Sequence, residues 1–315
     1  MRRIPPTERH AGPPAAARWC SCGPPHTVCP AGGFTLVELA ITLVVLGIVA
    51  LMLGQFAGGA VQSYLDAQRR AELVDTTETA LRRLQRDLRL ALPNSVRVTR
   101  AGSATFLEFV PVITGGRYRA ELAGGNPSSG NCGSSLNDTM RFGVADNTFT
   151  TIGPVADLPD SASASPATFV VIYNLGAGFA NADVYASGAT TGGNKSVYLK
   201  SGTAACESQI AFASHTFTLP SPSGRFHIVQ SPVTYACDTA TGRLDRYGDY
   251  ALAPVQPAPP VATARLALDS ISACDIFYSA TSVSQRIGVV SVSVTRTVNG
   301  ESVRLYHEIA VDNSP

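Results

Sequence analysis

One acidic residue stands at the start of the most apolar segment of this chain. Residues 33–38 read GFTLVE, and an apolar run follows them to Phe56. A charged side chain inside a membrane span costs roughly 2.5 to 3.5 kcal/mol at the helix centre, and such residues usually have a partner or a function. Glu38 is therefore the first candidate functional residue.

The apolar run is long enough to cross a membrane. From Leu36 to Phe56 it has 21 residues, which as a helix span about 30 Å, the thickness of a hydrocarbon core. Its large apolar positions are Leu36, Leu39, Ile41, Leu43, Val45, Leu46, Ile48, Leu51 and Leu53. Arginines precede the run and mixed polar sequence follows it, so the positive-inside rule predicts a cytoplasmic N-terminus and a periplasmic remainder.

A second helical pattern continues beyond the apolar run and ends near Pro93. Apolar or small residues recur there at mostly helical spacing among many charged side chains: Val61, Leu65, Leu73, Thr77, Leu81, Leu84 and Leu88. Such a stripe is typical of an amphipathic helix that packs one face against a folded domain. We therefore expect residues 57–92 to pack on the chain's own head.

The remainder of the chain reads as β-structure. The predicted strands are Thr105–Ile113, Thr139–Val144, Thr168–Tyr173, Ser196–Lys200, Arg225–Gln230, Val233–Cys237 and Ala273–Tyr278. Near the C-terminus two alternating segments, 290–295 and 303–311, flank Asn299-Gly300, which predicts a hairpin with a type I′ turn. The expected fold class is α+β: a long N-terminal helix on a mainly antiparallel β-rich head.

Seven cysteines divide between the two ends of the chain. Three lie within residues 1–33, and four follow the apolar run: Cys132, Cys206, Cys237 and Cys274. An even number in an oxidising compartment predicts two disulfides, and four cysteines allow three pairings. We favour Cys237–Cys274, which are near in sequence, and by elimination Cys132–Cys206.

The composition favours neither catalysis nor nucleic-acid binding. The chain has 315 residues and a net charge of +1, with no basic block, so we expect no nucleic-acid surface. His215, His227 and His307 are scattered and predict sheet histidines rather than metal ligands. The spacing of Asp238, Asp245 and Asp249 does not match an EF-hand. We expect a protein that is not an enzyme and has no cofactor.

The GFTLVE hexapeptide with the apolar run behind it resembles the class III signal of type IV prepilins and type II secretion pseudopilins. The resemblance implies that a prepilin peptidase cleaves between Gly33 and Phe34 and methylates the new amine of Phe34. It also implies that Glu38 pairs with the N-terminal amine of a neighbouring subunit during assembly. The expected organisation is a cleaved leader (1–33), a transmembrane helix half (34–56), an amphipathic half (57–92) and a periplasmic head (93–315). The leader is unusually long, and a start codon assigned too far upstream would account for it.

Further segments resemble the minor pilins of the mannose-sensitive haemagglutinin pilus. These segments are residues 91–97, 173–176, 224–227, 233–237 and 307–313. The implied partners are the peptidase, major and minor pilins, the inner-membrane assembly platform and membrane lipid. The implied location is the inner membrane and then the pilus fibre. Two alternatives stay open: a minor pseudopilin of a type II secretion system, and a tip adhesin whose head binds a ligand.

Overall fold

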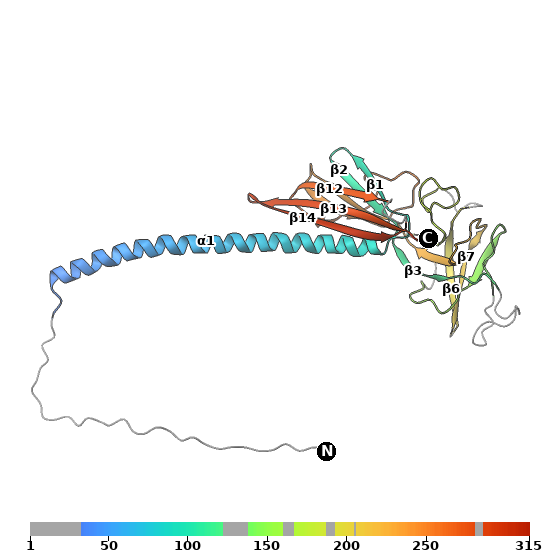
Figure 1. The fold of residues 1–315 in the computed structure, drawn as a ribbon, viewed down its shortest axis with the longest axis horizontal. Coiled ribbons are helices and arrows are strands. Elements are labelled where there is room, and N and C mark those ends of the chain that lie inside the picture. Colours follow the sequence, from blue (N-terminus) through green and yellow to red (C-terminus); the bar gives the residue numbers. More distant parts are fainter. Residues whose placement is uncertain (1–32, 122–137, 160–166, 187–192, 205, 281–285) are drawn as a thin grey trace, which may run out of the picture. The chain divides into compact units, whose positions relative to one another are not determined.

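The protein is one long helix followed by a β-rich head (Figure 1). The computed structural model describes residues 33–121, 138–159, 167–186, 193–204, 206–280 and 286–315. The chain divides into two compact units, Met1–Gln62 and Ser63–Pro315. Helix α1 covers Leu36–Arg89, and strands β1 to β14 follow it within the described residues. The predicted α+β fold class is confirmed.

Two antiparallel sheets and the end of α1 form what we call the helix lobe. The five-stranded sheet has the order β1-β2-β9-β10-β11 and the three-stranded sheet has the order β12-β13-β14. The first sheet comprises Arg97–Ala101 (β1), Ala104–Phe109 (β2), Val233–Asp238 (β9), Arg243–Tyr247 (β10) and Arg265–Leu268 (β11). The second comprises Ile271–Ser279 (β12), Ile287–Val298 (β13) and Glu301–Asp312 (β14).

The predicted C-terminal hairpin is confirmed as β13–β14. Its last pair before the turn is Val298↔Glu301, so Asn299 and Gly300 form a two-residue connection. Both have positive φ, 52° at Asn299 and 82° at Gly300, as a type I′ turn requires. The alternating pattern then places Val290, Val292 and Val294 in the core of the helix lobe.

The remaining strands form what we call the barrel lobe, an insertion between β2 and β9. Its strands are Val112–Arg117 (β3), Asp146–Thr150 (β4), Phe169–Ile172 (β5), Lys195–Ala204 (β6), Glu207–His215 (β7) and Arg225–Val229 (β8). Their order is β3-β8-β5-β6-β7-β4. Because β2 pairs with β9 and β3 pairs with β8, the chain enters and leaves this lobe along one two-stranded ribbon.

The two edges of the six-stranded sheet meet. Tyr118 forms a bridge with Thr151, Arg119 N–H donates to Thr150 O, and Ile152 N–H donates to Arg117 O. A closed sheet leaves no free edge and encloses a side-chain core. That core is aromatic: Tyr118, Phe149, Tyr198, Phe212, Phe217 and Phe226 are buried in one cluster.

Two strand predictions are wrong. Thr105–Ile113 is not one strand, because the chain passes from β2 to β3 at Val110 and Pro111, and proline has no N–H for a ladder. Thr139–Val144 forms no strand; its backbone bonds to separate segments, with Met140 N–H donating to Arg119 O and Gly143 N–H to Phe217 O. Sequence reasoning also missed β1, β4, β7, β10 and β11, of which β10 (RLDRY) carries three charges in five residues.

Candidate processing and assembly site

The Gly33–Phe34 peptide lies outside the helix and is exposed. Residues 33–35 have no regular secondary structure, and α1 begins at Leu36. Nothing lies within 4 Å of the position a Cβ would take on Gly33, and Phe34 is 77% exposed. Within the described residues this peptide is therefore open to a protease from the glycine side.

The local sequence fixes where the helix starts. The Glu38 N–H donates to Thr35 Oγ1 at 3.3 Å, and the Leu39 N–H donates to Thr35 O at 3.1 Å. Thr35-x-x-Glu38 has the spacing of a capping box, with threonine as the N-cap. The cap lies after the predicted cleavage point, so removal of residues 1–33 leaves it intact.

Glu38 is an exposed carboxylate in the first turn of α1. An acidic side chain is favoured there by the positive end of the helix dipole. Within the part of the chain that the structure describes, no hydrogen bond or ion pair reaches its carboxylate oxygens; the bond to Thr35 Oγ1 is made through its backbone N–H. The group is thus available to a cation supplied from outside this helix.

The first part of α1 is apolar on every side and buried nowhere. Leu36–Gln55 is a candidate membrane span of 20 residues by length and composition, with mean hydropathy 2.8. Every predicted apolar position is exposed: Leu36, Leu39, Ile41, Leu43, Val45, Leu46, Ile48, Leu51 and Leu53. Together with the sequence motif, this span is consistent with anchoring in an inner membrane.

The amphipathic stripe is confirmed from Leu73 onward. Leu73, Thr77, Leu81, Leu84 and Leu88 are buried, and the Thr77 hydroxyl donates to Leu73 O at 2.6 Å. Burial of a threonine in this apolar stripe is therefore balanced by a hydrogen bond.

The start of the predicted stripe is wrong. Val61 is 57% exposed and Leu65 is 38% exposed. For Leu65 the reason is the length of the β13–β14 hairpin, in which Glu301, the first residue of β14, forms an ion pair with Arg70. Residues 63–70 of α1 are all exposed.

Polar contacts fix the second part of α1 on the helix lobe. Asp87 Oδ2 accepts hydrogen bonds from the Tyr235 hydroxyl at 2.8 Å and Arg246 Nε at 2.9 Å. Burial, and next the nearby Asp87 carboxylate, raise the pKa of the Tyr235 hydroxyl above its ordinary value. One turn of helix thus meets β9 and β10 through a single carboxylate.

His307 forms a second contact of this kind, which sequence reasoning missed. Its Nε2 lies 3.0 Å from Glu78 Oε2 on α1. A hydrogen bond from Arg82, and then one with His307, hold the pKa of Glu78 below its ordinary value. Sequence analysis predicted a sheet histidine at this position, but the acidic partner is 229 residues away in sequence.

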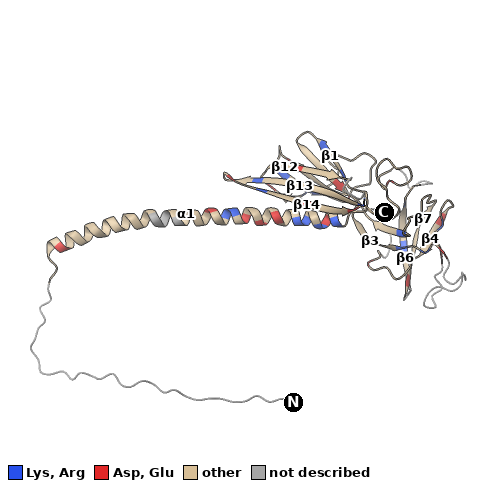
Figure 2. Cartoon of the chain, viewed as in Figure 1, with Lys and Arg blue, Asp and Glu red and all other residues tan. Residues whose placement is uncertain are grey.

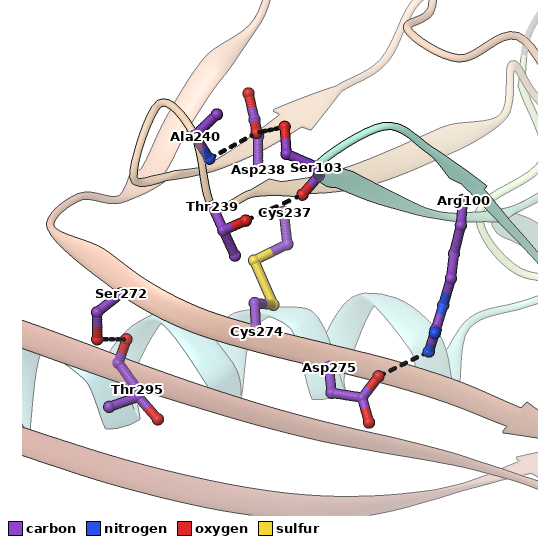
Figure 3. The surroundings of a disulfide bond; sticks show 10 residues. All are labelled: Arg100, Ser103, Cys237, Asp238, Thr239, Ala240, Ser272, Cys274, Asp275 and Thr295. Carbon is purple, nitrogen blue, oxygen red and sulfur yellow. Dashed lines mark hydrogen bonds and ion pairs between the residues drawn. A yellow bond between two sulfur atoms is a disulfide. The ribbon is translucent and has the colours of Figure 1, made fainter.

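The predicted Cys237–Cys274 disulfide is present and joins β9 to β12 (Figure 3). It links the five-stranded sheet to the three-stranded sheet, with the two Cα atoms 6.4 Å apart. Nearby, Arg100 of β1 pairs with Asp275 of β12 at 2.7 Å. Cys206 is also disulfide-bonded, and Cys132, its predicted partner, lies outside the described residues.

Two of the aspartates whose spacing does not match an EF-hand, Asp238 and Asp245, have structural partners. Asp238 accepts hydrogen bonds from the Ser103 hydroxyl and the Ala240 N–H (Figure 3) and a third from the Thr241 hydroxyl, and these bonds lower its pKa. Asp245 pairs with Arg243 at 2.9 Å. Among the described residues, no group of three or more His, Cys, Asp or Glu side chains could hold a metal ion.

Three asparagines join the end of α1, the barrel lobe and the C-terminus. Asn94 Nδ2 donates to Asn174 O at 2.9 Å and to Asn313 O at 3.1 Å. Asn174 Nδ2 donates to Pro93 O at 2.7 Å, and its Oδ1 accepts from the Val184 N–H at 2.8 Å. We call this set, Asn94, Asn174 and Asn313, the asparagine junction.

The junction leaves no room for a side chain at Gly176. A Cβ there would lie 2.8 Å from Asn94 O, and the residue has φ of +91°. Three of the five segments singled out by sequence resemblance, 91–97, 173–176 and 307–313, therefore converge at this point. Sequence reasoning had no signal for the convergence, because the three segments lie far apart in the sequence.

Comparison with known proteins identifies the N-terminal segment alone. Residues 30–54 match the family model described as the prokaryotic N-terminal methylation motif. That motif supports a type IV pilin or pseudopilin, and it implies processing by a prepilin peptidase and assembly with other pilins. No curated protein and no solved structure matches the chain.

Proposed function

We propose that this chain is a minor type IV pilin that acts in pilus assembly, at its initiation or at the fibre tip, and not as an enzyme. The observation that carries the proposal is the methylation motif at residues 30–54, which includes almost all of an apolar helix segment, Leu36–Gln55, that is buried nowhere. Such a surface requires lipid or other apolar helices around it. A cleavable leader before it fits a subunit that moves from membrane to fibre.

The proposed mechanism begins in the inner membrane, with the leader in the cytoplasm and the head in the periplasm. A prepilin peptidase of the host cleaves after Gly33 and methylates the amine of Phe34. The cap at Thr35 keeps α1 starting at the same residue before and after cleavage. The new cationic amine and an acidic Glu38 of a neighbouring subunit then compensate each other in an apolar setting, where each alone is costly.

The size of the head supports a minor role. The barrel lobe adds residues 112–229 to a helix lobe that already has its own core. A subunit with this added lobe suits an end of the fibre better than repeated packing along it. The five sequence segments that resemble minor pilins of the mannose-sensitive haemagglutinin pilus favour a role like that of its biogenesis protein MshO.

The test is N-terminal sequencing and intact mass of the protein purified from membranes, with and without the host peptidase. We expect a mature start at Phe34 carrying one extra methyl group, and loss of both changes without the enzyme. Gly33→Val should block cleavage. Gly47→Val is the matched control and should not, because Gly47 is not at the cleaved bond. The two substitutions are comparable, since nothing lies within 4 Å of a Cβ at either glycine. An uncut chain in the complete host would overturn the proposal.

The assembly role requires a separate measurement. Glu38→Gln should be processed normally but be lost from sheared fibres, while Glu121→Gln, an exposed carboxylate of the barrel lobe, should enter them. Deletion of the gene should reduce surface pili and leave type II secretion unchanged. Loss of secretion with intact pili would assign the chain to the pseudopilins.

A further inference from the structure

A polar cavity lies at the edge of the five-stranded sheet, beside the end of β10 and the start of β11. Its volume is about 380 Å³, within the range of about 300–1,000 Å³ that is usual for small-molecule sites. It is lined by residues of two segments: Arg246, Gly248, Asp249, Ala262, Thr263 and Arg265. Figure 2 shows the charged residues of the head dispersed among the strands of both lobes. The cavity differs from these surroundings because it brings three charged side chains together.

Two of these side chains are arginines on one face of the sheet. Arg246 and Arg265 stand directly opposite each other in the antiparallel ladder of β10 and β11. Like charges in such a position destabilise a strand pair. Asp87 pairs with Arg246, but among the described residues no ion pair reaches Arg265. The two guanidinium groups together can therefore take a further negative charge.

Arg246 is held so that one end of its guanidinium lies on the cavity side. Its Nε donates to Asp87 Oδ2 at 2.9 Å. Its Nη1 lies 3.5 Å from the position that a Cβ would take on Gly248, which lines the cavity. Because residue 248 is a glycine, no side chain of that residue covers Nη1. The contact with Asp87 thus fixes the arginine while Nη1 stays available to a ligand.

Asp249 adds a hydrogen-bond acceptor to the same lining. It is exposed, and within the part of the chain that the structure describes it forms no ion pair with either arginine. The next residue, Tyr250, is buried, and its hydroxyl lies 2.6 Å from Thr234 Oγ1, which anchors the turn that carries Asp249. A ligand that fills the cavity must therefore satisfy a carboxylate as well as two arginines.

This combination of charges selects among small polar ligands. A simple anion such as phosphate pairs with the arginines but is repelled by Asp249. An α-amino acid supplies a carboxylate, but its ammonium group has three N–H donors and the lining offers it one carboxylate. A sugar acid supplies a carboxylate for bidentate bonds with arginine, and hydroxyl groups that can donate to Asp249 and bond with the Thr263 hydroxyl. Of these ligands the sugar acid uses the most polar groups of the lining.

We propose that this cavity binds an acidic monosaccharide unit, with the sugar carboxylate at Arg265 and Arg246 and a sugar hydroxyl at Asp249. Arg265 and Asp249 are exposed, so the site is open to a ligand from solvent. The site lies wholly in the helix lobe. It gives the head a binding role that does not rest on the pilin assignment.

The first test is a titration of full-length protein in mild detergent, followed by ligand-observed NMR. The acidic sugars are glucuronate, galacturonate and N-acetylneuraminate, and the controls are galactose, acetate, phosphate and alanine. We expect at least one acidic sugar to bind about tenfold more tightly than every control, because each control lacks either the carboxylate or the hydroxyl groups. Absence of binding by all three sugars, or a control that binds as tightly as they do, would overturn the proposal.

The second test assigns the binding to this cavity. Arg265→Gln should weaken the sugar by about tenfold, because a bidentate charged contact is lost. Arg225→Gln, which alters an exposed arginine of β8 in the barrel lobe, is the matched control and should not weaken it. Arg246 is left unaltered because it also holds Asp87. Equal effects of the two substitutions would place the binding elsewhere and overturn the proposal.

Asp249→Asn distinguishes a sugar site from a simple anion site. The substitution keeps the size of the side chain but turns a charge-assisted hydrogen bond into a neutral one, so it should weaken the sugar by about threefold. It should strengthen acetate, because a repulsive charge is removed. Strengthening of both ligands would show a simple anion site and reject the sugar.

Gly248→Val tests the cavity without changing any charge. The atom nearest to the new Cβ is Arg246 Nη1 at 3.5 Å, an ordinary contact, so the valine should be tolerated and should weaken the sugar by narrowing the cavity. Thermal unfolding without sugar should be the same for this variant and the unaltered protein. Unchanged sugar affinity in a folded Gly248→Val variant would contradict binding in this cavity.

Failure here is distinct from failure of the proposed function. The substituted residues lie far from Gly33 in sequence, so the mature start at Phe34 should be unchanged in all the variants by intact mass. Normal processing with no sugar binding would reject this inference and leave the pilin assignment standing.

Discussion

Leu46 and Leu84 are the same residue type in the same helix, yet one is 63% exposed and the other is fully buried. Around Leu46 the sequence is apolar on every side, so no single sheet could cover it. Around Leu84 the apolar residues lie on one face and charged residues on the other. Two ways of distributing apolar residues along one helix thus demand two environments: lipid or other subunits for the first part, and the chain's own head for the second.

The largest expected effect concerns the surface on which the second part of α1 rests. That surface is assembled from two sheets joined by Cys237–Cys274, with a sequence separation of 37. The double variant Cys237→Ala/Cys274→Ala should lower the free energy of unfolding of the head by about 3 to 4 kcal/mol. Thermal unfolding in detergent measures this loss.

Hydrogen exchange in the same variant tests the comparison directly. Amides near Leu84 should exchange faster, since their protection depends on the folded head, while amides near Leu46 should be unchanged. Equal acceleration in both segments would show that α1 responds as one unit and would contradict the division into two environments.

Leucine truncation gives the next largest effect. Leu84→Ala removes a fully buried side chain and should cost about 3 kcal/mol of head stability, from lost transfer energy and a cavity. Leu46→Ala is the matched control and should change head unfolding by less than about 0.5 kcal/mol. A similar loss from both variants would mean that the first part of the helix is also buried against protein.

The parts of the molecule that sequence reasoning predicted depend on short-range patterns. The apolar span, the stripe from Leu73 to Leu88 and the Asn299-Gly300 turn can each be identified within a few turns or one hairpin. The closure of the barrel lobe could not be predicted from such patterns, because it joins Arg117 to Ile152 and depends on the pairing of six strands. The asparagine junction was missed for the same reason: Asn94 and Asn313 are 219 residues apart.

Loss of the Asp87 contact should lower the stability of the head by less than loss of the disulfide or truncation of Leu84. Asp87→Asn keeps the shape of the side chain but removes the charge that Tyr235 and Arg246 share, and should cost about 2 kcal/mol. Asp66→Asn alters an exposed pair with Arg69 and should cost less than about 0.5 kcal/mol. Denaturant titration of the two variants distinguishes them, and equal midpoints would show that the helix lobe does not depend on the Asp87 contact.

The smallest expected effect is a pH dependence at the Glu78–His307 contact. The pKa of Glu78 is held below its ordinary value of 4.5 in the folded protein, so the unfolded chain binds a proton there more readily than the folded chain. Its contribution to stability is therefore fully present above pH 4.5 and is lost as the pH falls below it. Glu78→Gln should flatten the dependence of stability on pH in that acidic range. It should leave a small constant loss of stability in the neutral range, since the side chain is partly exposed.

The control is Glu72→Gln, an exposed helix carboxylate with no ion pair among the described residues, which should leave the dependence of stability on pH as in the unaltered protein. A slope unchanged by Glu78→Gln would show that the second part of α1 is held on the sheet by its apolar stripe and Asp87, without help from this contact.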